Sequence, residues 1–187
     1  MAALEDAVEP SILRLARGEG SVLTGMEVLA LERWAAKTCL VLESSLPHME
    51  MKVLTPELAK AVMRACISST GPQGFYTWLC ATQMESPSYM RTSVSAFWPP
   101  GHDCAGHGWR VTTIQLGSVA FLTVYTGDRL AGEYLWGKQD DLWDALGSMP
   151  HNGPKAIWHI DRDSPLSFDQ LRLRHDNVRA LLVEDSN

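Results

Sequence analysis

The chain has 187 residues, of which 45% are hydrophobic and 20% charged, and 16 basic against 22 acidic residues give a net charge of −6. This composition excludes a disordered polypeptide, because the apolar side chains suffice to offset the entropy lost on folding, and a negative chain does not attract nucleic acid through its overall field. No apolar run approaches the ~18 residues that span a bilayer, and the first ten residues carry acidic side chains before any basic one, so we expect a cytoplasmic protein with no membrane partner.

The first 70 residues predict three helices. Apolar residues recur at helical spacing between positions 4 and 15, and Pro10 predicts a kink there or two short helices. Thr24 and Glu27 have the spacing of a capping box for a second helix that ends near Glu43. Thr55-Pro56 opens a third helix that ends near Ser68.

The second predicted helix is apolar on more than one side, so we expect it to be largely buried. Lys37 lies within it, and we expect this ammonium group to pair with Glu32 or Glu43.

The rest of the chain predicts an antiparallel sheet. Strands are expected over 75–82, 91–98, 109–116 and 119–126, and Gly117-Ser118 is typical of a two-residue hairpin turn. A short helix is expected over 140–146, a short strand over 156–160, and a helix after Ser167 with Phe168, Leu171 and Leu173 on its inner side.

This order of elements predicts an α+β fold, in which N-terminal helices pack on an antiparallel meander and a short C-terminal helix follows. We expect a single domain over 1–187, with a helical part (1–70), a sheet-rich part (71–173) and a tail (174–187).

The densest group of reactive side chains lies in the stretch 101–108. His102, Cys104 and His107 could supply three zinc ligands, and zinc is the one cofactor that the sequence suggests. A structural zinc site normally takes pairs of ligands from separate segments, whereas these residues share one short stretch. The interpretation that we favour is a Gly-rich loop between two strands.

Aromatic and basic side chains give two candidate binding surfaces. Among seven tryptophans, Trp34, Trp78, Trp98 and Trp158 fall within predicted elements and are expected in the core. Trp136 and Trp143, together with Tyr134, are the better candidates for contact with a partner. Arg172 and Arg174, near the C-terminus, could contact phosphates, although a solvated helix is the interpretation that we favour.

Three stretches resemble a known group of proteins. Met1-Ala2-Ala3-Leu4-Glu5, with Pro10 and Gly18 after it, is similar to the segment that follows the nuclease motif of HNH-endonuclease-like bacterial and phage proteins. The segment 31–43, L-E-R-W-A-A-K-T-C-L-V-L-E, resembles a helix of that group, and the segment 110–127 resembles its β-hairpin. Ile157-Trp158 matches an I-W-P near the end of those proteins, with His159 in place of the proline.

In that group the zinc ligands and the catalytic His-Asn pair precede the matching segment. The resemblance therefore implies the C-terminal accessory region without the nuclease head, and it assigns no catalytic residue to this chain.

We therefore expect a non-catalytic macromolecule-binding or regulatory module of bacterial or phage origin, whose partner is another protein or a protein–nucleic-acid complex. A phage-encoded inhibitor of a bacterial defence complex would fit, since an acidic surface complements a basic nucleic-acid channel. The alternatives are a DNA-binding accessory domain that binds nucleic acid directly, and a metal-dependent enzyme that uses His102, Cys104 and His107.

Overall fold

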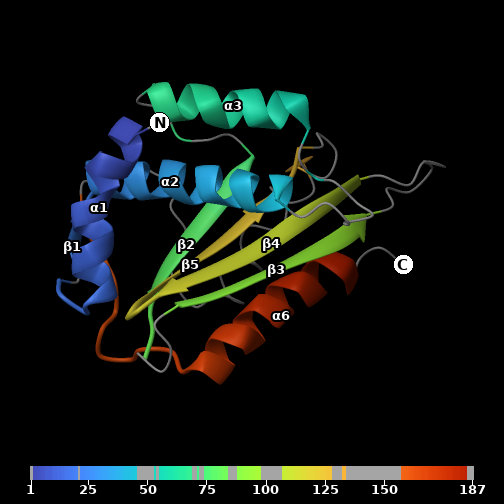
Figure 1. Cartoon of the computed structure of the whole chain (residues 1–187). Helices are drawn as coiled ribbons and strands as arrows, with labels where there is room; N and C mark the ends of the chain where they lie inside the picture. Colours follow the sequence, from blue (N-terminus) through green and yellow to red (C-terminus); the bar gives the residue numbers. More distant parts are fainter. Residues whose placement is uncertain are drawn as a thin grey trace.

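In the computed structural model, a four-stranded sheet lies between two layers of helices (Figure 1). The structure describes residues 2–20, 22–45, 53, 55–68, 71, 74–83, 88–97, 107–127, 132–133 and 157–184. Helices α1 (Ala2–Ala16), α2 (Gly25–Ser44) and α3 (Pro56–Ile67) cover one face of the sheet, and α6 (Phe168–Glu184) covers the other. The predicted α+β class is confirmed.

Local signals set the helix boundaries much as the sequence predicts. The Thr24 side chain accepts a hydrogen bond from the backbone N–H of Glu27, and the Glu27 carboxylate accepts one from the backbone N–H of Thr24, which completes the capping box. The Thr55 side chain caps α3 by accepting a hydrogen bond from the backbone N–H of Leu58.

Helix α1 is a single element, so the alternative of two short helices at Pro10 is wrong. Proline removes the backbone bond to the carbonyl four residues earlier, which is that of Asp6. Both residues are exposed, so water can reach that carbonyl and the helix continues.

The sheet comprises β2 (Phe75–Ala81), β3 (Ser88–Phe97), β4 (His107–Leu116) and β5 (Val119–Tyr125), all antiparallel, in the order β2-β5-β4-β3. The predicted meander holds for β3, β4 and β5. It is wrong for β2, which pairs with β5 rather than with β3 and lies at the opposite edge of the sheet. The turn predicted at Gly117-Ser118 joins β4 to β5, and Gly117 has a positive φ of 55°.

Alternation along the strands creates two cores. On β5, Phe121 packs with α1 and α2, whereas Leu122 and Val124 point to the other face and pack with Val178 and Leu182 of α6. Every residue of β5 is buried, as expected for an inner strand that is covered on both faces.

Helix α6 is longer than the short helix predicted and runs through the boundary placed between residues 173 and 174, so residues 174–184 are not a separate tail. Leu171 is buried as predicted, but Leu173 is 59% exposed, because two residues turn the helix by about 200°. Before α6, strand β6 (Ile157–His159) pairs with β1 (Val22–Thr24) beside the main sheet.

Candidate functional site

Most of the residues predicted to bind a metal or a partner lie outside the described residues. This is the case for His102 and Cys104, and for Tyr134, Trp136 and Trp143. His107 is the first residue of β4, where its backbone pairs with that of Phe97. The zinc hypothesis and the aromatic-surface hypothesis therefore stay predictions.

Arg172 and Arg174 both lie on α6, but they do not form one basic surface. Two residues along a helix are about 200° apart around its axis, and Arg172 is exposed whereas Arg174 is half-buried. The guanidinium carbon of Arg172 lies 5.8 Å from the centre of the Phe168 ring, in the position of a cation–π contact. His175, which follows Arg174 in the chain, is fully buried and adds nothing to a basic surface.

The two tryptophans expected in the core whose side chains the structure describes differ in how deeply they are buried. Trp78, on β2, is 2% exposed, as predicted. Trp34, on α2, is only half-buried, so its assignment to the core is wrong in part. Its ring packs against Phe121 with 5.2 Å between ring centroids, and the rest of the indole borders a surface hollow. Trp98 lies outside the described residues, as does the side chain of Trp158.

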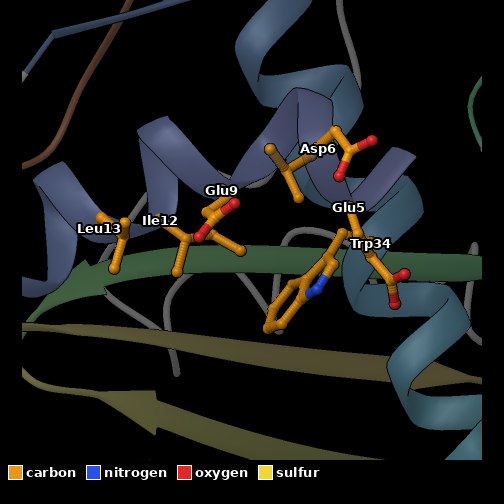
Figure 2. Close-up of a pocket in the computed structure, with 7 residues that line it drawn as sticks. Glu5, Asp6, Glu9, Ile12, Leu13 and Trp34 are labelled. Carbon is orange, nitrogen blue, oxygen red and sulfur yellow. The ribbon is translucent and has the colours of Figure 1, made fainter. Parts of the chain in front are cut away.

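This hollow, of about 250 Å³, is the candidate site (Figure 2). It lies between α1 and α2, and Figure 2 shows the side chains of α1 along one side and the Trp34 indole from α2 near Glu5. We call it the α1–α2 pocket, and its lining residues are Glu5, Asp6, Val8, Glu9, Ile12, Leu13 and Trp34.

The helix period explains why α1 lines a pocket and also packs in the core. Leu4, Val8 and Leu15 recur at helical spacing and are buried in the core. Glu5 and Glu9 follow Leu4 and Val8 by one position, so they form a second stripe at the edge of the first, and Ile12 lies one turn after Val8 and packs against the core. The pocket therefore has an apolar floor and an acidic rim.

The carboxylates of the rim differ in their partners. Glu5 forms an ion pair with Lys37 of α2, whose side chain is only 12% exposed. Lys37 therefore does not pair with Glu32 or Glu43 as predicted, because α1 brings Glu5 to it from a distant part of the chain. The carboxylates of Asp6 and Glu9 make no ion pair or hydrogen bond with the described part of the chain, and both residues are exposed.

The shape and composition of the pocket limit what it can bind. Its volume lies below the roughly 300–1,000 Å³ of sites for drug-sized ligands, and is nearer to that of one side chain. Within the described residues, no three His, Cys, Asp or Glu side chains are arranged to hold a metal ion. Carboxylates beside an exposed indole favour an organic cation, above all the planar guanidinium group.

A second polar cluster is fully enclosed under α2. Glu43 Oε1 lies 3.2 Å from Nη2 of Arg110, and its Oε2 accepts a hydrogen bond of 3.0 Å from the hydroxyl of Tyr125. The backbone N–H of Val53 donates to the same carboxylate at 2.7 Å. Desolvation is the main cause of a strongly raised pKa for Tyr125, and the negative charge of Glu43 adds to it. These groups are buried against solvent, so the cluster holds α2 to the sheet and offers no access to a substrate.

A row of threonines crosses the sheet beside this cluster. Thr77, Thr123, Thr112 and Thr92 are consecutive register partners, one from each strand in the order β2-β5-β4-β3. Hydrogen bonds of 3.2 and 3.1 Å join the outer pairs. The thiol of Cys39, on α2, lies over the row, and burial raises its pKa to about 12, so it is not a nucleophile at neutral pH.

On the opposite face of the sheet, α6 inserts a buried histidine. His175 Nε2 lies 2.8 Å from Oγ of Ser93, and its Nδ1 lies 2.8 Å from Oγ1 of Thr113. Burial lowers the pKa of His175 to about 4, and the charges of Arg91 and Arg179 act in the same direction. A serine beside a neutral imidazole has the composition of a nucleophile–base pair. Because α6 covers this pair and His175 is fully buried, its role is to fix α6 on the sheet.

The sequence interpretation missed His175 and Glu43, although both carry a signal. Leu171, His175, Val178 and Leu182 follow one another at spacings of three or four, so the histidine stands in an apolar helical stripe. Glu43 continues the stripe of Ala35 and Cys39 on α2 in the same way. A polar residue within such a stripe predicts a buried hydrogen-bonded group.

No protein-family model, curated protein or solved structure matches this chain. The resemblance to HNH-endonuclease-like proteins, and with it an origin in a bacterium or phage, stays a prediction. Within the described residues, no helix has the length and apolar character needed to cross a membrane.

Proposed function

We propose that the protein is a non-catalytic binding module, and that its α1–α2 pocket receives a basic side chain of a partner protein. The observation that carries this proposal is the combination, in one hollow, of the carboxylates of Asp6 and Glu9 with the half-buried indole of Trp34. The chain as a whole carries a net charge of −6, which favours association with a basic partner.

Arginine suits this pocket better than lysine. A guanidinium group is planar, so its face can stack on the indole of Trp34 while its N–H groups, which lie in its plane, donate hydrogen bonds to a carboxylate. A lysine ammonium group is a compact charge that gains less from a flat ring. The contact of Trp34 with Phe121 fixes the indole in advance, which reduces the entropy lost when a partner binds.

A displayed library of random peptides tests the proposal, because the selected sequences report the class of the partner group. We expect the selected peptides to be enriched in arginine, and to a lesser degree in lysine. Peptides selected on an Asp6→Asn, Glu9→Gln double variant should not show this enrichment. A Glu19→Gln, Glu57→Gln double variant is the matched control, since it removes the same charge from exposed sites outside the pocket and should retain it.

A Trp34→Leu variant separates stacking from charge. It should reduce the preference for arginine over lysine, while urea unfolding reports any loss of packing against Phe121. Selection without enrichment in basic residues, or equal selection by the pocket variant and the control, would overturn the proposal.

A further inference from the structure

Strand β3 is the outermost strand on its side of the sheet (Figure 1). Among the described strands it pairs with β4 alone, so alternate backbone N–H and C=O groups point away from the sheet. At the opposite edge, the end of β2 is partly covered, because the backbone of Leu166 bonds to those of Ala81 and Gln83. No such backbone contact covers β3 in the described part of the chain.

The features that normally prevent pairing at a sheet edge are absent from β3. Its ten residues, S-Y-M-R-T-S-V-S-A-F, contain no proline and no lysine, and all ten pair with β4 without a bulge. Its one charged residue, Arg91, is bound to Asp176 of α6 at 2.7 Å. Met90 is 51% exposed on the face of the sheet opposite to α6.

We propose that β3 pairs antiparallel with β3 of a second copy of this chain, about a twofold axis at Thr92, to form a continuous eight-stranded sheet. Every second residue of β3 carries backbone groups that point outward. Pairing these groups sets each such residue opposite another of the same set, so each face of the sheet continues into the other copy. Met90 then lies opposite the partner's Val94, and Arg91 lies opposite the partner's Ser93. A register centred on Arg91 would oppose two guanidinium groups and is disfavoured.

Helix α6 lies on a face of the sheet that would continue into the second copy. It contacts β3 and β4, and its Val178 and Leu182 also pack in one cluster with Leu122 and Val124 of β5. The twofold axis places the two α6 helices antiparallel on this shared face, and the ion pair of Asp176 with Arg91 brings one flank of each helix to the shared edge.

The side chains on the exposed flank of α6 are self-complementary in that arrangement. Asp176 reaches Arg91 of β3, so this flank faces the sheet edge, and Asp169, Arg172 and Arg179 lie within about 60° of it around the helix. An antiparallel copy brings Arg172 to the partner's Asp176 and Asp169 to the partner's Arg179.

The proposed interface is separate from the α1–α2 pocket, whose lining residues come from α1 and α2 alone. The two proposals therefore stand or fall independently. A dimer of this kind leaves both pockets open, and two pockets on one body increase the avidity for a partner that carries two basic sites.

Light scattering over a dilution series tests the dimer. We expect a mass of twice the 20.7 kDa of one chain at high concentration. Met90→Lys places a charge in the new strand pair, and Arg172→Glu sets a carboxylate opposite the partner's Asp176, so each should give a monomer. Ile67→Lys, at an 85% exposed site on α3, is the matched control and should remain a dimer. Urea unfolding of all three variants shows whether each one folds.

Cysteine cross-linking tests the register. Thr92→Cys places two thiols near the axis and should form a disulfide across the dimer under mild oxidation. Ser88→Cys places them roughly 27 Å apart along the strands and should not, and the wild-type chain gives the background from its own four cysteines. A wild-type monomer at every concentration would overturn the proposal. So would a dimer that survives both disrupting substitutions, or equal cross-linking at the two sites.

Discussion

Nδ1 of His175 lies 2.8 Å from Oγ1 of Thr113, inside a contact between α6 and the sheet that excludes water. The other ring nitrogen is bound to Ser93, so the neutral imidazole has one hydroxyl partner at each nitrogen. Protonation would place a positive charge in this contact, close to Arg91 and Arg179, and the pKa of His175 is accordingly lowered to about 4 from 6.5.

The free energy of unfolding should therefore depend on pH through His175. The folded pKa lies below that of the unfolded chain, so the unfolded state binds the extra proton between pH 6.5 and 4. Stability is fully present above pH 6.5 and falls by about 3 kcal/mol as the pH decreases to 4. Urea unfolding at a series of pH values should show this loss in the wild-type chain and a flatter profile in His175→Gln. Parallel profiles for the two chains would show that His175 does not titrate in this way.

Glu43→Gln should destabilise the protein strongly. The substitution removes the negative partner of the buried Arg110 guanidinium, and breaking a buried pair on one side typically costs about 3–5 kcal/mol. Tyr125→Phe removes only a hydrogen bond to the same carboxylate and should cost about 1–2 kcal/mol. Denaturant unfolding of both variants gives the comparison. A smaller loss in Glu43→Gln than in Tyr125→Phe would contradict the assigned role of the ion pair.

Gly117→Ala should destabilise the junction between the β4–β5 turn and α1. An added Cβ would lie 2.3 Å from the carbonyl oxygen of Ala16, at a residue whose φ is 55°. The backbone N–H of Ser118 donates to that same oxygen at 2.9 Å, so the turn cannot move away without losing a bond. We expect a loss of about 2 kcal/mol, or a fall in Tm of about 4–8 °C. Gly132→Ala, where the nearest atom is 3.7 Å away, is the control and should leave Tm unchanged.

Thiol labelling should follow burial. Burial raises the pKa of all three described thiols, to about 12 for Cys39 and about 11 for Cys80, and at Cys66 the positive charges of Lys37 and Arg33 oppose the rise. Cys39 is buried, whereas Cys66 and Cys80 are both half-buried. With an aromatic disulfide reagent at pH 8, Cys66 should react first among these three thiols, Cys80 should react more slowly, and Cys39 should react only as the chain unfolds. Mass spectrometry of digested samples identifies each site. Early labelling of Cys39 would show that α2 leaves the sheet readily.

The features that the sequence predicted well are those set by residues close to one another in the chain. The capping box of Thr24, the proline after Thr55 and the glycine at 117 each act within a few residues, so their elements begin and end close to the predicted positions. Leu173 shows the limit of a local pattern, because only the packing of α6 decides which of several apolar residues points inward.

The candidate site and its surroundings could not be predicted in this way, since they join distant segments. Lys37 meets Glu5 rather than an acid of its own helix, and Ser93 meets His175 across most of the sheet-rich part of the chain. The pocket depends on the packing of α1 against α2, and Trp34 of α2 lies at its border. A sequence pattern predicts that a residue is apolar enough to bury, but not which element will cover it.

The place of β2 in the sheet has a consequence for the newly made chain. Its partner, β5, is made after β3 and β4, and Phe75 pairs with Tyr125. A ribosome that has released residues only as far as 97 has therefore delivered two strands that are not neighbours in the sheet. The sheet can close only when β5 emerges, and α6 can cover its second face only later still. Folding during translation should thus be delayed towards the end of synthesis, a period in which β2 and β3 are open to chaperones.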